Sequence, residues 1–102
     1  MDKVIAGKTI SVNEEGYMTD LSQWNEDIAS EMAKEYDIEL TPKHIEVLTY
    51  LQEQFKNNVP LSIRKVGSSG VVSIKELYEL FPNGPLKIST KLAGIPKPAS
   101  CI

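Results

Sequence analysis

The sequence predicts an α+β protein that is mainly α-helical, with a small N-terminal β-hairpin. Residues 25–36 and 42–56 carry apolar side chains at the three- and four-residue spacing of an amphipathic helix. The β-prone runs are short and lie within residues 4–18. After residue 59, glycine and proline recur so often that only short helices fit between them. These observations predict helices of unequal length beside one β-ribbon.

The first 20 residues are expected to form the hairpin region. Residues 4–5 and 9–12 are β-prone, and they flank residues 6–8, which suit a tight turn. A second turn is expected at residues 13–16, and another extended piece begins at residue 17. Because so small a ribbon is unstable alone, we expect it to lie against helices.

Capping residues mark the starts of the first two helices. Asn25 can cap the first helix, which is expected to end near Tyr36. Thr41 suits the N-cap of the second helix and Pro42 its first position, and this helix is expected to end at Asn57. The faces expected to pack comprise Ile28, Ala29, Met32, Ala33 and Tyr36, and then Ile45, Leu48, Leu51, Gln52 and Phe55.

Three shorter helices are expected after them. The first covers about residues 61–66, the second opens at a capping box that starts with Ser73, and the third covers residues 86–93. The first two flank a glycine-containing turn at residues 67–70, as in a helix-turn-helix, whose second helix could enter a DNA major groove. That helix offers no Arg, Asn or Gln for bidentate contacts with bases, so a DNA-binding regulator is a minority hypothesis.

Composition restricts the class of protein. A chain of 102 residues with 41% hydrophobic and 25% charged residues suits one compact domain. No run approaches the roughly 18 apolar residues of a membrane-spanning helix, and the first residues lack the apolar stretch of a signal peptide. The single cysteine excludes a disulfide within the chain, so a reducing, cytoplasmic location is expected.

Charge is distributed unevenly along the chain. Residues 1–59 hold five Lys and twelve Asp or Glu, a net charge of −7, whereas residues 60–102 hold five Lys, one Arg and two Glu, a net charge of +4. Each half can simply present a solvated surface. Alternatively, the basic half orients an acidic partner or a phosphate backbone.

The only histidine, His44, lies in the first turn of the second predicted helix. A metal site needs several converging ligands, and the sequence has neither a second histidine nor a cysteine motif. His44 is therefore expected at the surface or as a capping residue, and no metal or cofactor is expected.

Residues 94–102 are predicted to form a mobile C-terminal arm that carries the only cysteine. Gly94 suits a left-handed stop after the last helix, and Pro96 and Pro98 prevent a further helical turn. At about 3.1 Å per residue in polyproline II, the arm could carry Cys101 on the order of 25 Å from that helix. A cysteine near a chain end can be incidental, because chain ends tolerate most residues. Alternatively the thiol is functional, since an exposed reactive thiol is a liability unless it is used. The arm's composition leaves both interpretations open.

A resemblance to a known family favours the second interpretation. Residues 77–85 and 91–98, followed by the penultimate Cys101, resemble the DsrC/TusE family of small sulfur carriers, which includes the so-called gamma subunit of dissimilatory sulfite reductase. The similarity spans nearly the whole chain. It extends to Gly16-Tyr17, Ser22-Gln23-Trp24, Thr41-Pro42-Lys43-His44 and Ile63-Arg64.

The resemblance implies an orthogonal helical bundle with an N-terminal β-hairpin, occupying residues 21–93 and 1–20, and a flexible C-terminal arm. Family members that serve sulfite reductase use two arm cysteines, and the position of the second corresponds to Thr90 here. Threonine cannot form a disulfide. The resemblance therefore points to the TusE type, in which one cysteine accepts a persulfide and passes it toward tRNA 2-thiouridine synthesis.

This resemblance implies a sulfurtransferase-type carrier with Cys101 as the persulfide carrier. Lys97, or a folded-back contact with Arg64 or Lys91, could favour the thiolate, the reactive form of the thiol. The expected partners are a sulfur-donor and a sulfur-acceptor protein, with tRNA reached only indirectly and neither membrane nor DNA involved. Docking on sulfite reductase as a partner subunit is the alternative.

Overall fold

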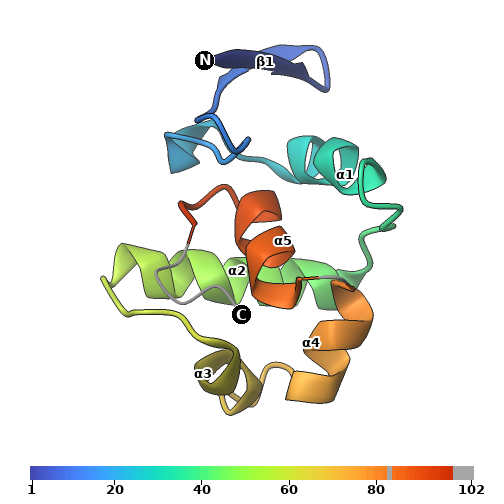
Figure 1. Ribbon diagram of the computed structural model, residues 1–102, viewed down its shortest axis with the longest axis vertical. Helices are drawn as coiled ribbons and strands as arrows, with labels where there is room; N and C mark the ends of the chain where they lie inside the picture. The colour runs from blue at the N-terminus through green and yellow to red at the C-terminus, as the bar shows by residue number, and fades with distance from the viewer. Residues whose placement is uncertain (83, 98–102) are drawn as a thin grey trace.

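The computed structural model describes residues 1–82 and 84–97, and Asn83 and residues 98–102 lie outside the described part. Helices account for most of its regular structure, and the one sheet has two strands (Figure 1). In chain order the elements are β1 (Asp2–Ile5), β2 (Lys8–Ser11), the 3₁₀ helix η1 (Leu21–Gln23), α1 (Glu26–Lys34), α2 (Pro42–Lys56), α3 (Ile63–Gly67), α4 (Ile74–Leu80) and α5 (Pro85–Leu92).

The two strands form the predicted antiparallel hairpin. Asp2 pairs with Ser11 at the open end and Ile5 with Lys8 beside the turn. The turn residues, Ala6 and Gly7, both have positive φ, 51° and 78°, as a two-residue type I′ turn requires. A further bridge joins residues 12 and 18, so the extended piece expected after the second turn is also present.

The caps predicted for α1 and α2 are confirmed. The side chain of Asn25 accepts a hydrogen bond of 2.9 Å from the amide of Ile28. Thr41 caps α2, and His44 completes a capping box by accepting a 3.1 Å hydrogen bond from the Thr41 amide through Nδ1. Each cap satisfies an amide group that the first turn of a helix leaves without a partner.

Of the two alternatives expected for His44, a surface residue or a capping residue, the structure confirms the capping residue. Its side chain is buried, and Nε2 donates a 3.0 Å hydrogen bond to the carbonyl of Leu80, at the end of α4. The ring also meets Phe81 edge-on, with 5.2 Å between centroids. His44 therefore connects the start of α2 with the end of α4.

The third helix begins later than predicted, at Ile63 rather than residue 61. Ser62 has an extended backbone, and its hydroxyl accepts a 3.1 Å hydrogen bond from the amide of Lys65, which makes it the N-cap. The helix then packs against α4, as expected for the part similar to a helix-turn-helix. Gly67 allows this approach, because a Cβ there would collide with the side chain of Ile74.

Helix α5 lies at the centre of the molecule (Figure 1). It crosses α2 and contacts α1 and α4 as well. Its side chains are buried on almost every side, including the polar Ser89 and Thr90. The arrangement confirms the predicted orthogonal helical bundle, with the hairpin at one end next to α1 and with α3 and α4 at the other.

The short helix η1 was not predicted, and it places the only tryptophan. Asp20 precedes η1, and its carboxylate accepts hydrogen bonds from the hydroxyl and the amide of Ser22, at 2.7 and 3.0 Å. These two bonds lower the pKa of Asp20 below its ordinary value of 3.8. Trp24 directly follows η1, and its amide donates to the carbonyl of Leu21.

Within residues 1–82 and 84–97, the helices are too short and too polar for any of them to cross a membrane.

The lowered pKa of Asp20 predicts that η1 loosens in acid. Because the folded pKa lies below 3.8, the stabilising contribution is complete above that pH and is lost as the pH falls through the folded value. The fluorescence of Trp24 should therefore change below about pH 4. Asp20→Ala should produce a similar change already at neutral pH. Asp2→Ala, which removes an exposed carboxylate from β1, is the control, and equal spectra for both variants would contradict the prediction.

Candidate functional site

The structure describes the start of the predicted arm and its surroundings. Gly94, Pro96, Lys97, Lys91 and Arg64 are all described, whereas the predicted carrier Cys101 and also Pro98 lie outside the described residues. The candidate site is therefore built from the end of α5 and from the side chains that hold it.

Helix α5 ends in a Schellman motif, and Gly94 supplies the left-handed residue that this motif requires. Gly94 adopts a left-handed conformation with a φ of 76°. Its amide donates to the carbonyl of Lys91 at 3.2 Å, and the amide of Ile95 donates to the carbonyl of Thr90 at 3.3 Å. The predicted left-handed stop is therefore confirmed, and two of the terminal carbonyl groups of α5 have partners.

Two distant side chains bond the next two carbonyl groups. The indole Nε1 of Trp24 donates to the carbonyl of Leu92 at 2.7 Å. The amide Nε2 of Gln52, on α2, donates to the carbonyl of Ala93 at 2.9 Å. Gln52 was expected on the packed face of its helix, and neither hydrogen bond was predicted.

Ile95 shows that the predicted arm begins too early. Its side chain is only 1% exposed and belongs to the hydrophobic core. Gly94 before it is also buried, whereas Pro96 and Lys97 are exposed. The physical reason is that the Schellman motif turns Ile95 back onto the core, where its apolar side chain leaves water. The chain leaves the core at Pro96, two residues after the predicted boundary.

The cations predicted near the arm differ in their surroundings. Lys97 forms a salt bridge of 3.1 Å with Glu15, between β2 and η1. Lys91 donates a 2.9 Å hydrogen bond to Oη of Tyr36, and its ammonium lies 5.0 Å from the ring centroid of Tyr17. Lys91 and Lys97 thus contact residues from the first half of the chain.

Arg64 is exposed on α3, and its side chain has no salt bridge with another described residue. Helix α3 lies at the end of the bundle opposite the hairpin, whereas Lys91 and Lys97 contact residues from the first half of the chain (Figure 1). Contact between Arg64 and the end of the arm remains a prediction.

Thr90 is the residue that the resemblance matches to a second arm cysteine. It is fully buried in α5, and its hydroxyl donates a 2.7 Å hydrogen bond to the carbonyl of Leu86. The Thr90 side chain is therefore hydrogen-bonded within its own helix.

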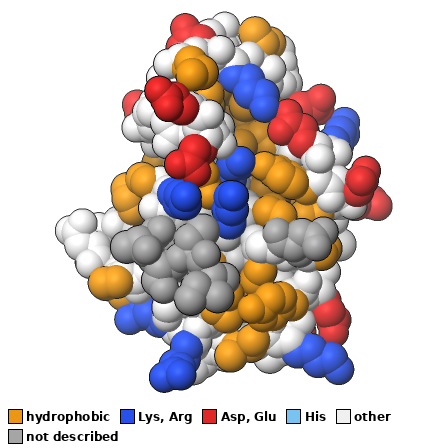
Figure 2. Space-filling model, viewed as in Figure 1, with side chains coloured by type: hydrophobic (Ala, Val, Ile, Leu, Met, Phe, Trp, Pro, Cys, Tyr) orange, Lys and Arg blue, Asp and Glu red, His pale blue; other side chains and the backbone are white. Residues whose placement is uncertain are grey.

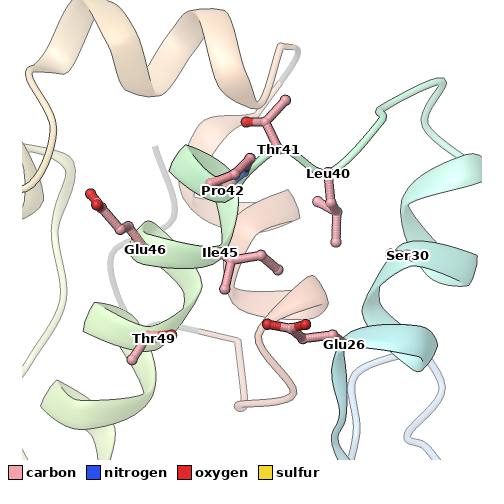
Figure 3. Close-up of a pocket in the computed structure, with 8 residues that line it drawn as sticks. All are labelled: Glu26, Ser30, Leu40, Thr41, Pro42, Ile45, Glu46 and Thr49. Carbon is pink, nitrogen blue, oxygen red and sulfur yellow. The ribbon is translucent and has the colours of Figure 1, made fainter.

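A groove that could hold a small ligand lies elsewhere in the described structure. It has a volume of about 550 Å³ between α1 and the start of α2, where Leu40 and Ile45 point toward the gap and the carboxylate of Glu26 lies at its edge (Figure 3). None of the predicted site residues lines this groove. Among the described residues, no group of three or more His, Cys, Asp or Glu could hold a metal ion.

Charge is unevenly spread over the face shown in Figure 2. Asp and Glu side chains lie mainly over the end that holds β1 and α1, whereas Lys and Arg side chains occur at both ends. The salt bridge between Lys97 and Glu15 joins the two halves of the chain.

Gly94 allows a direct test of how tightly the base of the arm is packed. An ideal Cβ at this position would lie 2.9 Å from Cδ1 of Trp24 and 3.1 Å from Sδ of Met18. Gly94→Ala should therefore destabilise the fold by about 2–4 kcal/mol, from left-handed strain plus the collision.

Gly7→Ala is the matched control for this substitution. Gly7 has nearly the same φ, 78°, and no atom within 4 Å of its ideal Cβ. It should lose only about 1–2 kcal/mol, the cost of the left-handed conformation. Urea denaturation measures both variants, and equal losses would show that the packing around Gly94 is loose.

Comparison with known proteins supports the family resemblance. The chain matches the family model described as DsrC like protein over residues 4–102. It is 36% identical to the sulfurtransferase TusE of Escherichia coli K12 and 38% identical to that of Photorhabdus laumondii. The alignments cover 97% of this chain and 98% and 96% of these relatives, respectively.

Solved structures show the same fold. The NMR structure of Allochromatium vinosum DsrC is 35% identical, with a TM-score of 0.79. The crystal structure of the oxidized gamma subunit of dissimilatory sulfite reductase (DsrC) from Archaeoglobus fulgidus is 30% identical, with a TM-score of 0.80. Both alignments cover the whole of both chains. The predicted fold and a role in sulfur relay are confirmed, and the chain belongs to the DsrC like protein family.

Proposed function

We propose that the protein relays sulfur as a persulfide on Cys101. The observation that carries this proposal is the position of the only cysteine, one residue from the end of a chain that matches the family over residues 4–102. The anchored base supports it, because the chain leaves the core at the exposed Pro96, five residues before Cys101. A thiol at this position can enter a partner's site without unfolding of the core.

The proposed chemistry conserves atoms and electrons without an added oxidant. The Cys101 thiolate attacks the outer sulfur of a donor persulfide, a new S–S bond forms, and the donor cysteine leaves as a thiolate. The acceptor thiolate then attacks the outer sulfur of the Cys101 persulfide, and Cys101 returns to its thiolate form. One sulfur atom moves in each step, and the protein returns to its starting state.

The described residues supply a platform for this transfer but no general base. His44 is buried, with one ring nitrogen bonded to Thr41 and the other to Leu80. A free thiol has a pKa of about 8.5, so a small fraction is thiolate near neutral pH. In our proposal, the donor's site completes the activation of the thiol, and the protein acts as a shuttle.

We propose the TusE type of relay, in the cytoplasm, with sulfur passed toward tRNA 2-thiouridine synthesis through an acceptor protein. The curated relatives named sulfurtransferase TusE support this, and so does the absence of a second cysteine from the sequence. Docking on dissimilatory sulfite reductase is the second candidate, because a structural neighbour is the gamma subunit of that enzyme. A disulfide cycle within the chain is excluded in either case by the single cysteine.

Cys101→Ser tests the proposal directly. Wild-type protein incubated with a cysteine desulfurase and L-cysteine should gain the mass of one sulfur atom, and a reductant should remove it. The Ser variant should gain nothing, because a hydroxyl cannot form a persulfide. Its thermal unfolding should match that of the wild type, since Cys101 lies beyond the core residues described here. Intact-protein mass spectrometry makes the measurement.

Inorganic polysulfide, used as a second donor, separates two explanations of a negative result. If polysulfide loads the wild type but the desulfurase does not, that desulfurase is the wrong donor. If neither reagent adds sulfur to a thiol that iodoacetamide alkylates, the proposed carrier role is wrong.

A further inference from the structure

We propose that Trp24 and Gln52 are positioning residues for sulfur transfer, because they determine where and in which direction the arm leaves the core. This inference rests on the proposed function only for its consequence in transfer. The geometry that carries it lies wholly within the described residues.

The last four carbonyl groups at the end of α5 cannot be bonded by amides of the helix itself. All four nevertheless accept a hydrogen bond from another donor. The Schellman motif bonds the carbonyls of Thr90 and Lys91 through backbone amides. Trp24 and Gln52 bond the next two, those of Leu92 and Ala93. The side-chain bonds therefore act at the last two residues before Gly94, where the chain changes direction.

Trp24 holds this point from the side of the hairpin and α1. Its Nε1 donates to the carbonyl of Leu92 at 2.7 Å, and its ring lies against Gly94 so closely that a Cβ there would collide with it. Its own position is set by η1, which begins at the Asp20 cap. The indole therefore donates a hydrogen bond to the end of α5 and also packs directly against the turn at Gly94.

Gln52 holds the same point from α2. Its Nε2 lies 2.9 Å from the carbonyl oxygen of Ala93, and the side chain is half-buried. Helix α2 also packs directly on α5. Because the two donors come from different elements, the peptide groups of Leu92 and Ala93 are fixed in position and in orientation.

The segment beyond the core is therefore shorter than predicted, and its starting direction is fixed. Ile95 is buried and Pro96 is the first exposed residue after it, five residue steps before Cys101. At about 3.1 Å per residue in polyproline II, these steps reach on the order of 16 Å. Over an extended span of this length, a rotation of about 10° at Ala93 would displace the end by about 3 Å, and transfer to a partner's site depends steeply on misplacement of this size.

A purely structural role, the capping of α5, is the competing explanation. Capping predicts a loss of stability and nothing more when a donor is removed. Positioning predicts an additional change in where the end of the arm lies. The two explanations differ in a readout that does not depend on stability or on sulfur chemistry.

The chain offers a direct distance measurement, because it has one tryptophan at the base of the arm and one cysteine at its end. Cys101 is labelled with a fluorescent acceptor, and energy transfer from Trp24 is recorded by time-resolved emission. Gln52→Glu keeps the size of the side chain but removes the NH₂ donor. Gln54→Glu is the matched control, since Gln54 lies on the same helix, is also half-buried and makes no side-chain hydrogen bond with a described residue.

Positioning predicts that Gln52→Glu shifts and broadens the distribution of Trp24-to-label distances, whereas Gln54→Glu leaves it as in the wild type. Equal distributions in all three proteins would overturn the proposal, even if Gln52→Glu lowers the Tm. This arm of the experiment is independent of the proposed function, because no sulfur is transferred.

The transfer arm uses unlabelled protein with a cysteine desulfurase as the sulfur donor. Gln52→Glu and Trp24→Phe, which removes the indole donor, should each slow sulfur loading by about tenfold. The rate of Cys101 alkylation by iodoacetamide should stay within about twofold of the wild type, because the thiol itself is unchanged. Alkylation slowed in parallel with loading would overturn the positioning role. If the desulfurase does not load the wild type but polysulfide does, polysulfide replaces it as the donor in this comparison; a wild type that takes up sulfur from neither would defeat the proposed function and leave the distance measurement to decide this inference.

Discussion

The carbonyl groups at the buried end of α5 need hydrogen-bond donors, and the structure around the base of the arm follows from that need. A buried carbonyl without a partner costs free energy, so each one must be bonded by backbone, side chain or water. Here Gly94 lets the chain turn so that backbone amides supply two donors, and Trp24 and Gln52 supply two more. The same contacts join the C-terminal end of α5 to α2 and to the segment after the hairpin.

The end of α5 lies between the core and the segment that leads to Cys101, the residue proposed to carry sulfur. Ile95 is buried and Pro96 is exposed, so the change from core to surface takes place across one peptide bond. Nearby, Lys91 contacts Tyr36 and Tyr17, and Lys97 pairs with Glu15. These contacts again reach the first half of the chain. The groove between α1 and the start of α2 is lined by none of the residues at the base of the arm, whereas a smaller groove of about 400 Å³ is lined in part by Lys91.

Much of the local structure was predictable because helix caps act over three or four residues. Asn25, Thr41, Ser73 and Gly94 perform the roles that their side chains, or the lack of one, indicate. The predicted strands pair in the expected hairpin. The resemblance to the DsrC/TusE family rested on residues near the C-terminus, and comparison over the whole chain confirmed it. The contacts with distant partners were missed, as in the bond from His44 to Leu80, and Phe55 was predicted on the packed face although it is 42% exposed.

The sequence by itself determined the hairpin, the order of the five α-helices, the left-handed stop after α5, and the position of the only cysteine one residue from the end. These properties depend on neighbouring residues and on composition. Only the tertiary structure decided that His44 bonds Leu80, that the arm leaves the core at Pro96, and that Trp24 and Gln52 bond the end of α5. The last two contacts join residues 68 and 41 positions apart. No local pattern encodes such pairs, because they form only when helix packing brings the two surfaces together.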